Sequence, residues 1–259
     1  IVPYGAGLRL LLAQDVTQIK KMERMRTDFV ANVSHELRTP LTVLKGYVET
    51  LQEMDDVPPI FVRSFASMAA QTERMQNLID DLLLLAKLET KEKKSECVPM
   101  RHLLGQICKE SDLLEKDERR VELEITTDDD LNGDPQELQS AFTNLLVNAL
   151  KYSPASSPVK VGWHQKPCGS LYLEVEDFGE GIAATDIPRI TERFYRVDSK
   201  RKQKIAGTGL GLAIVKHVLV RHDAKLEIDS HPGKGSRFRC LFPVQRACRS
   251  QASPSKYPA

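Results

Sequence analysis

A histidine at position 35 lies in a polar string that could carry phosphoryl chemistry. Residues 34–41 read SHELRTPL, within a stretch of helical periodicity. A neutral imidazole is a good nucleophile towards a phosphoryl group, and the adjacent carboxylate of Glu36 can accept the released proton. Thr39 lies one helical turn after His35 and could orient a water for hydrolysis of an acyl phosphate on a docked partner. Most lone exposed histidines are only solvated, so the rest of the chain must decide.

A second group of residues has the types that bind a nucleotide and its metal. Asn144 and Asn148 are four residues apart and share one helix face, with Lys151 close to it. Amide oxygens are suitable ligands for Mg²⁺, and a lysine can neutralise phosphate charge. Taken alone, this pattern also fits the polar face of a surface helix.

Two glycine-rich segments follow. Asp177 comes directly after an expected strand, where its carboxylate could accept a hydrogen bond from an exocyclic amine such as that of adenine, and Gly179 and Gly181 let the backbone approach a ligand closely. Residues 207–212 read GTGLGL and open an expected helix, where successive N–H groups form an anion site. This loop is not a Walker A loop, because no Gly-Lys-Ser/Thr follows it. It is a poor Rossmann candidate, because it does not come early in a βαβ unit.

The segment between the two glycine clusters is basic. Arg193 and Arg196 begin a run of cations that continues to Lys204. Arginines suit a γ-phosphate, although a charge run is more often a solvated surface.

The element expected to carry His35 is a helical hairpin. Apolar residues recur every three or four positions from Met22 to Leu51 and again from Phe61 to Ala86, with a break at residues 55–59. Residues 20–93 are therefore expected to form two long antiparallel helices, with His35 on the exposed face and Pro40 bending the first helix. Since such a hairpin cannot bury both apolar stripes, we expect it to dimerise into a four-helix bundle.

The rest of the chain has a mixed pattern. Residues 97–245 are expected to form an α+β two-layer sandwich, with helices near 101–114, 135–151 and 210–221 and strands near 121–126, 159–164, 171–176, 224–230 and 236–242. Residues 1–19 contain an apolar run, 8–13, expected to be a strand. Residues 246–259 are rich in Ser, Pro, Ala and Arg and are expected to be a disordered tail.

Composition narrows the function classes. The formal net charge of +1 over 259 residues gives no basic field for nucleic acid, and no helix suited to reading DNA stands out. The five cysteines form no CxxC pair, so reduced thiols in a cytosolic compartment are expected, with no disulfide framework and no metal spacing. The apolar runs are far shorter than the roughly 20 residues that span a bilayer.

In order and spacing these segments resemble the conserved boxes of bacterial two-component sensor histidine kinases. Residues 34–41 resemble the H-box, and residues 144–153, 177–182, 192–196 and 207–212 resemble the N, G1, F and G2 boxes. The resemblance covers about residues 20–245. It implies a HisKA-type dimerisation and phosphotransfer hairpin followed by an ATP-binding domain of the GHKL type, the fold shared with type II topoisomerases and Hsp90 chaperones.

The resemblance also implies a role for each matched residue. ATP would phosphorylate His35, with Glu36 supporting proton transfer and Thr39 supporting dephosphorylation of the partner. Asn148 and Asn144 would hold Mg²⁺, and Asp177 would bind adenine. The other residues implied to bind the nucleotide are Lys151, Tyr152, Gly179, Gly181, Ile182, Arg193, Phe194, Arg196, Gly207, Thr208, Gly209, Leu210, Gly211 and Leu212. Residues 193–207 would form a mobile lid. Phe178 departs from the family pattern, since many relatives carry a small or polar residue there.

Three strings, residues 29–35, 42–47 and 191–198, are similar to the phosphate-regulon subfamily, and residues 15–17 resemble the end of a PAS sensor domain and its linker. This resemblance implies a homodimer, a response-regulator receiver domain as partner and a role in phosphate-limitation signalling. The chain would be a cytoplasmic part of a protein anchored in the bacterial inner membrane upstream of residue 1.

Two alternatives stay open at this point. One is another enzyme on the same ATP fold, an ATPase or a serine kinase without phosphohistidine, which the string around His35 disfavours. The other is a non-catalytic dimeric scaffold, which the intact acceptor, asparagine and glycine positions disfavour.

Overall fold

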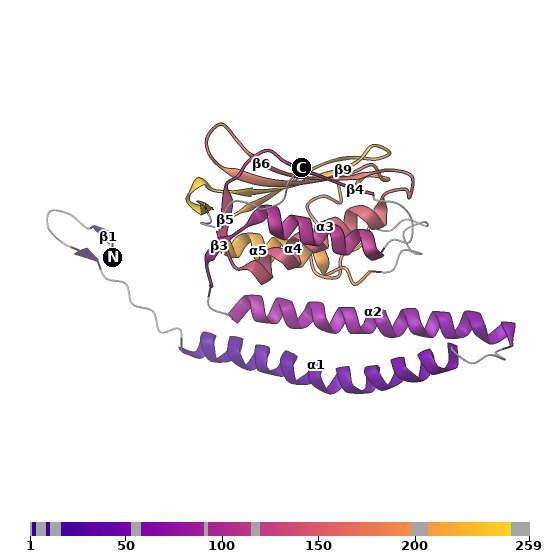
Figure 1. The fold of residues 1–259 in the computed structure, drawn as a ribbon. Coiled ribbons are helices and arrows are strands. Elements are labelled where there is room, and N and C mark those ends of the chain that lie inside the picture. The colour runs from indigo at the N-terminus through magenta and orange to yellow at the C-terminus, as the bar shows by residue number, and fades with distance from the viewer. Residues whose placement is uncertain are drawn as a thin grey trace.

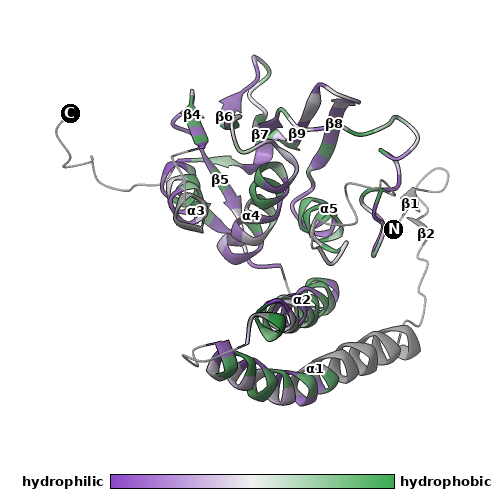
Figure 2. Cartoon of the chain, turned by 90° about the vertical axis from the view of Figure 1, so that its right-hand side faces the viewer, coloured by the Kyte–Doolittle hydropathy of each residue, from purple (hydrophilic) through white to green (hydrophobic). Residues whose placement is uncertain are grey.

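The computed structural model describes residues 2–3, 9–10, 17–52, 58–90, 93–114, 120–197 and 207–249. They form a helical hairpin and an α/β domain, and α2 lies between α1 and that domain (Figures 1 and 2). The predicted order of a hairpin followed by a mixed α/β domain is confirmed.

The hairpin consists of α1, Thr17–Gln52, and α2, Pro59–Thr90. Pro40 lies inside α1, which is bowed along its length (Figure 1). Leu41 of α1 packs against Ile79 and Leu83 of α2. Arg38 forms an ion pair with Asp80 across the two helices. The buried contact of Leu41 and the ion pair of Arg38 therefore join α1 to α2.

Part of both predicted apolar stripes stays exposed in the single chain. On α1, Leu37 is 47% exposed and Leu44 is 52% exposed, and on α2, Met68 and Met75 are each 52% exposed. Each helix can turn only part of its apolar surface to the one helix that faces it. The exposed remainder is the surface expected to meet a second copy.

The α/β domain is built on a five-stranded sheet in the order β4-β6-β7-β9-β8, antiparallel except for the parallel pair β4 and β6. The strands are β4 Val121–Ile125, β6 Val159–Gln165, β7 Leu171–Asp177, β8 Lys225–His231 and β9 Gly235–Phe242. The helices α3 Met100–Leu114, α4 Pro135–Tyr152 and α5 Gly211–Arg221 cover one face of this sheet (Figure 2). The side chains of Phe142, Trp163 and Phe242 fill the layer between sheet and helices. The predicted two-layer sandwich is confirmed.

A second, small sheet lies at the end of the domain where the chain enters it from α2. It has the order β10-β5-β3, with β3 Glu96–Val98, β5 Asp130–Gly133 and β10 Ala247–Cys248, all antiparallel. A 3₁₀ turn, Val244–Arg246, leads into β10. Strands of two to four residues carry too little alternation to be read from a sequence. The expected tail at 246–259 was set too early, since Ala247 and Cys248 pair with β5 and the side chain of Arg246 donates hydrogen bonds to the domain. Residues 250–259 lie outside the described residues.

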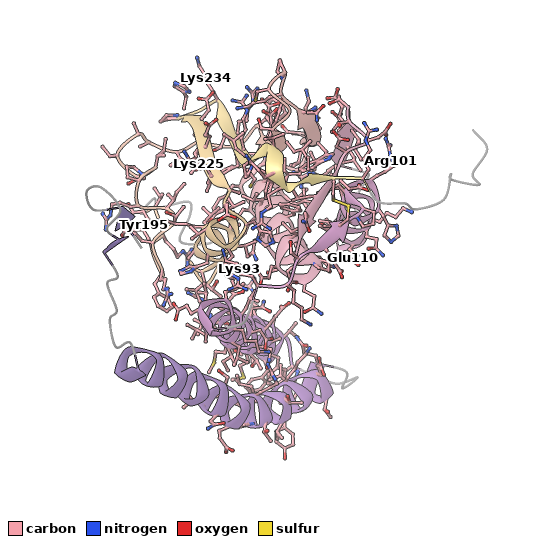
Figure 3. All side chains as sticks on the ribbon, turned by 90° about the vertical axis from the view of Figure 1, so that its left-hand side faces the viewer. Lys93, Arg101, Glu110, Tyr195, Lys225 and Lys234 are labelled. Carbon is pink, nitrogen blue, oxygen red and sulfur yellow. A yellow bond between two sulfur atoms is a disulfide. The ribbon has the colours of Figure 1, made fainter. Side chains whose placement is uncertain are left out.

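The expectation that all five cysteines are reduced thiols was wrong. Cys97 of β3 and Cys248 of β10 form a disulfide, with their Cα atoms 6.0 Å apart (Figure 3). Both strands pair with β5, which brings together two residues 151 positions apart in the chain. A separation of that length leaves no pattern in the sequence. Cys108, Cys168 and Cys240 take no part in a disulfide.

At the N-terminus β1, Val2–Pro3, pairs with β2, Arg9–Leu10, which lies inside the strand expected at 8–13. The other residues before Thr17, including the PAS-like string at 15–16, lie outside the described residues. In the described part of the chain, no helix combines the length and apolar character needed to cross a membrane.

Candidate functional site

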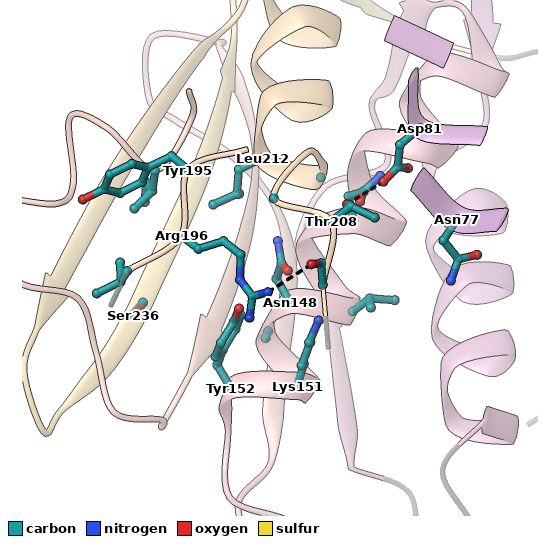
Figure 4. A pocket seen from close by; sticks show the side chains of 18 of the residues that line it. Asn77, Asp81, Asn148, Lys151, Tyr152, Tyr195, Arg196, Thr208, Leu212 and Ser236 are labelled. Carbon is teal, nitrogen blue, oxygen red and sulfur yellow. Dashed lines mark hydrogen bonds between the residues drawn. The ribbon is translucent and has the colours of Figure 1, made fainter. Parts of the chain in front are cut away.

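A cavity of about 560 Å³ lies between α2 and the α/β domain (Figure 4). Its walls come from α2, α4, the end of β7, residues 180–197, the glycine-rich loop at 207–212 and β9. Thirteen of the residues expected to bind nucleotide line it: Asn144, Asn148, Lys151, Tyr152, Asp177, Gly181, Ile182, Arg196, Gly207, Thr208, Gly209, Gly211 and Leu212.

Helix α4 presents the amides. Its N-terminus is fixed by Asp134, whose carboxylate accepts hydrogen bonds from the backbone N–H groups of Gln136 and Glu137. Three turns along, the side-chain nitrogen of Asn144 donates to the carbonyl of Ser140 at 2.9 Å. The amide oxygen therefore turns towards α5, where a Cβ on Gly211 would approach it to 2.5 Å. An engaged nitrogen and a presented oxygen fit the donor set that Mg²⁺ prefers.

The glycine-rich loop has the geometry of an anion site. Gly209 has a φ of 74°, and a Cβ there would meet the backbone of Phe194 at 3.0 Å, so only glycine fits. The loop leads into α5, whose N-cap residue Leu210 makes no side-chain capping bond. The first N–H groups of such a helix have no acceptor within the helix, and a phosphate can accept their hydrogen bonds.

The opposite end of the cavity is polar at one point and otherwise apolar. Asp177, only 5% exposed, accepts a 2.8 Å hydrogen bond from the N–H of Gly179 and is also hydrogen-bonded by Ser236. Burial raises the pKa of its carboxyl group above the ordinary value. Ile182 and Phe238 line the wall around it. One buried carboxylate in an apolar slot suits a flat heterocycle with an exocyclic amine.

Cations gather at the end of the cavity near the glycine-rich loop. Burial lowers the pKa of Lys151, and the nearby guanidinium groups of Arg196 and Arg74 lower it further. Arg196 donates a 3.3 Å hydrogen bond to the carbonyl of Gly207. Like charges held this close favour an anionic ligand between them.

Four of the expected nucleotide-binding residues do not line the cavity. Arg193 instead forms an ion pair with Glu89 of α2 and contacts His217 of α5. Phe194 is 56% exposed and has a φ of 65°, and Leu210 is fully buried in the core. Gly179 is buried behind Asp177, where a Cβ would come within 2.2 Å of the carbonyl of Tyr152. Their expected roles in binding remain predictions.

The expected acceptor site lies on the other helix of the hairpin. Glu36 and Thr39 are exposed on α1, and the side chain of His35 lies outside the described residues. Among the described residues, none from α1 lines the cavity, since α2 stands between α1 and the domain (Figure 1).

The sequence analysis did not place α2 in the site. Six of its residues line the cavity: Ala70, Glu73, Arg74, Asn77, Asp80 and Asp81. The hydroxyl of Thr208 donates a 2.8 Å hydrogen bond to Asp81 (Figure 4). The only signal was the spacing of these polar residues, three and four apart on the side of α2 away from its apolar stripe.

Fold and cavity together define a class of protein, a helical hairpin joined to a nucleotide-binding α/β domain. Residues 25–91 match the family described as His Kinase A (phospho-acceptor) domain. Residues 133–246 match the family described as histidine kinase-, DNA gyrase B-, and HSP90-like ATPase. With these two domains in this order, the chain belongs to the sensor histidine kinases.

Named relatives agree. The chain is 48% identical over 259 residues to the phosphate regulon sensor protein PhoR of Pseudomonas aeruginosa, an alignment that covers 98% of this chain and 58% of the relative. It is 36% identical over 241 residues to PhoR of Haemophilus influenzae, covering 93% of this chain and 56% of the relative. The chain thus spans somewhat more than half the length of these relatives. In fold, it is similar to full-length ShkA in complex with AMPPNP, with a TM-score of 0.65 at 24% identity over 83% of this chain and 45% of that one.

Proposed function

We propose that this chain is an ATP-dependent protein-histidine kinase that phosphorylates its own His35 and passes the phosphoryl group to an aspartate of a response regulator. One observation carries the proposal: the cationic, glycine-rich end of the cavity lies against α2. Helix α2 pairs in the hairpin with α1, which carries His35. The nucleotide site and the acceptor hairpin are thus already in contact.

The described side chains have definite parts in this reaction. Asp177 and the apolar wall hold the adenine, while Lys151, Arg196 and the N–H groups at the start of α5 offset the charge of the phosphates. Asn144 and Asn148 would hold Mg²⁺, which supplies further charge neutralisation at the phosphates. The imidazole of His35 forms a bond to the γ-phosphorus as the bond to the ADP oxygen breaks, and Glu36 supports the removal of the imidazole proton.

Transfer to His35 requires a change of arrangement. The acceptor helix lies beyond α2 from the domain (Figures 1 and 2), so the domain must leave its contact with α2, or serve the acceptor of a second protomer. The exposed apolar residues of both helices support a homodimeric four-helix bundle. The polar contacts that hold the domain on α2 include the bond from Thr208 to Asp81 and the ion pair of Arg193 with Glu89. At the end of α2, Leu85 and Leu88 are also buried in the core of the domain, and Arg221 of α5 donates a hydrogen bond to the carbonyl of Leu88.

The relatives named above support a proposal for the partner and the signal. A receiver domain docked on the bundle would take the phosphoryl group, and Thr39 would support its later hydrolysis. The identity with two phosphate regulon sensor proteins supports a role in phosphate-limitation signalling. We further propose that the whole protein is held at the bacterial inner membrane.

The test is labelling with γ-labelled ATP and Mg²⁺. Wild type is compared with His35→Gln and with His102→Gln, a matched change at an exposed histidine of α3. Acid-labile, base-stable label is expected in wild type and His102→Gln and absent from His35→Gln. Label of equal strength in His35→Gln would assign the acceptor elsewhere, and acid-stable label would point to a serine or threonine kinase.

A further inference from the structure

One wall of the nucleotide cavity belongs to the hairpin. Arg74, Asn77 and Asp81 are three and four residues apart and share one face of α2. That face is separate from the one that closes the hairpin, where Ile79 and Leu83 pack against Leu41. The α2 wall is therefore available to the cavity without disturbing the pairing of the two helices.

The α2 wall faces the phosphate end of the site. Asp81 accepts the hydrogen bond of Thr208, a residue of the glycine-rich loop, so α2 and that loop are in contact (Figure 4). Asp177, which marks the adenine end, lies on β7. A nucleotide held between these two points would have its terminal phosphates directed at α2.

Arg74 is the only cation among the described α2 residues that line the cavity. It lies close enough to Lys151 to lower that residue's pKa, as Arg196 does from the domain side. Of the three α2 carboxylates that line the cavity, Asp80 pairs with Arg38 and Asp81 accepts the hydrogen bond of Thr208, while Glu73 is next to Arg74 in the sequence. Cations from three separate elements thus converge on one volume, an arrangement that a polyphosphate would stabilise.

We propose that Arg74 is a nucleotide-binding residue supplied by the hairpin, whose guanidinium binds the terminal phosphate of ATP while the domain lies against α2. Bound ATP then bridges the hairpin and the domain. Since ADP lacks the γ-phosphate, Arg74 favours the triphosphate over the diphosphate. This inference rests on the proposed nucleotide site and adds to it a residue outside the ATP-binding domain.

The test measures the affinity of the full chain for Mg²⁺ with a non-hydrolysable ATP analogue, and separately with ADP, by calorimetry. Arg74→Gln is expected to weaken binding of the analogue about tenfold and of ADP less than about twofold, because a guanidinium–phosphate contact is a strong charge-assisted bond. The matched control is Arg63→Gln, an exposed arginine three helical turns earlier on the same face of α2 and outside the cavity. It is expected to bind both nucleotides as wild type does.

Unchanged affinity for the analogue in Arg74→Gln, or an equal loss for ADP, overturns the inference. Arg74→Lys keeps the charge and loses the planar guanidinium group. Its affinity for the analogue is expected to lie between those of wild type and Arg74→Gln, with about a threefold loss. If Arg74→Gln does not fold, as judged by helical circular dichroism, the Lys variant decides by the same criterion. Failure of the proposed function looks different, since wild type itself would then bind no nucleotide or leave His35 unlabelled.

Discussion

The hydroxyl of Thr208, in the glycine-rich loop, donates a 2.8 Å hydrogen bond to the carboxylate of Asp81 on α2, 127 residues earlier in the chain. This bond ties the glycine-rich loop to the hairpin. It also places an acid beside a site built for anions, and burial raises the pKa of that acid above its ordinary value. Asp81 therefore holds the domain in place and at the same time opposes the charge of a bound nucleotide.

Replacing Asp81 by Asn keeps an acceptor for Thr208 and removes the negative charge. We expect Asp81→Asn to bind the ATP analogue about two- to fivefold more tightly, since removing a partly exposed like charge near a phosphate is worth about 1 kcal/mol or less. Calorimetry at fixed ionic strength measures this. Asp128→Asn, an exposed carboxylate that pairs with Arg101 outside the cavity, is the control and should not change. Weaker binding in Asp81→Asn would mean that the carboxylate supports the site.

Gly209 should tolerate no side chain. Gly209→Ala combines a left-handed φ of 74° with a Cβ 3.0 Å from the backbone of Phe194, so the loop must shift and nucleotide affinity should fall by about tenfold or more. Gly233→Ala provides a matched control, with a φ of 78° and nothing within 4 Å of the added Cβ. The control should lose about 1 kcal/mol of stability and bind normally. Similar affinities in the two variants would show that the loop is not part of the site.

Thr39 is expected to act on the regulator and not in the kinase step. Its side chain is exposed on α1, away from the cavity. Thr39→Ala should keep ATP-dependent labelling of His35 within about twofold and lose most of the dephosphorylation of a phosphorylated receiver domain, because the proposed role of the threonine is to orient water for that hydrolysis. Both activities are measured on one preparation, with Thr42→Ala, also exposed on α1, as the control. Unchanged dephosphorylation in Thr39→Ala would remove this role.

The disulfide between Cys97 and Cys248 should stabilise the α/β domain. It closes a loop over 151 residues, and constraint of so long a loop in the unfolded chain is worth about 3 to 5 kcal/mol. Dithiothreitol should lower the urea midpoint of wild type. The midpoint of Cys97→Ser should already be lower and should not change with reductant. Cys168→Ser removes an exposed free thiol and should respond to reductant as wild type does. If the wild-type midpoint does not change with reductant, the disulfide does not contribute to stability.

Periodicity alone predicted the long elements well. Helices at 101–114, 135–151 and 210–221 were placed to within a residue or so of α3, α4 and α5, because each buries one clear stripe against the sheet. The amide positions of α4 and the glycine-rich loop entered the cavity as expected, because residue type and spacing fix which face of a helix they occupy.

What the sequence did not predict depends on contacts between distant segments. The wall that α2 contributes, the ion pair of Arg193 with Glu89 and the bond of Thr208 to Asp81 each join the hairpin to the domain. No local pattern encodes how two folded units meet. The same holds for β3, β5 and β10, which are too short to show alternation and exist because they pair with one another.

His222, at the end of α5, makes the stability of the domain depend on pH. It is 3% exposed; its Nε2 accepts a 3.1 Å hydrogen bond from the N–H of Asp134, and its Nδ1 lies 2.8 Å from the carbonyl of Val218. A nitrogen that accepts cannot carry a proton, so the fold requires the neutral ring. Burial lowers the pKa of His222 below its ordinary value of 6.5, despite the nearby carboxylate of Glu137 and the bond to Val218.

The unfolded chain therefore binds a proton that the folded chain rejects, and stability falls as pH drops below about 6.5. The loss can reach about 1.4 kcal/mol per pH unit from this one group. Urea unfolding of wild type and His222→Gln at pH 7.5, 6.5 and 5.5 measures it. Because the substitution by glutamine itself changes stability at every pH, the slopes are compared and not the values. The variant should show the shallower slope between pH 6.5 and 5.5. His164→Gln, a partly exposed histidine at the end of β6, is the control and should keep the wild-type slope. Parallel slopes in wild type and His222→Gln would show that the ring does not need to be neutral, and the bond from Asp134 would then lose its assigned importance.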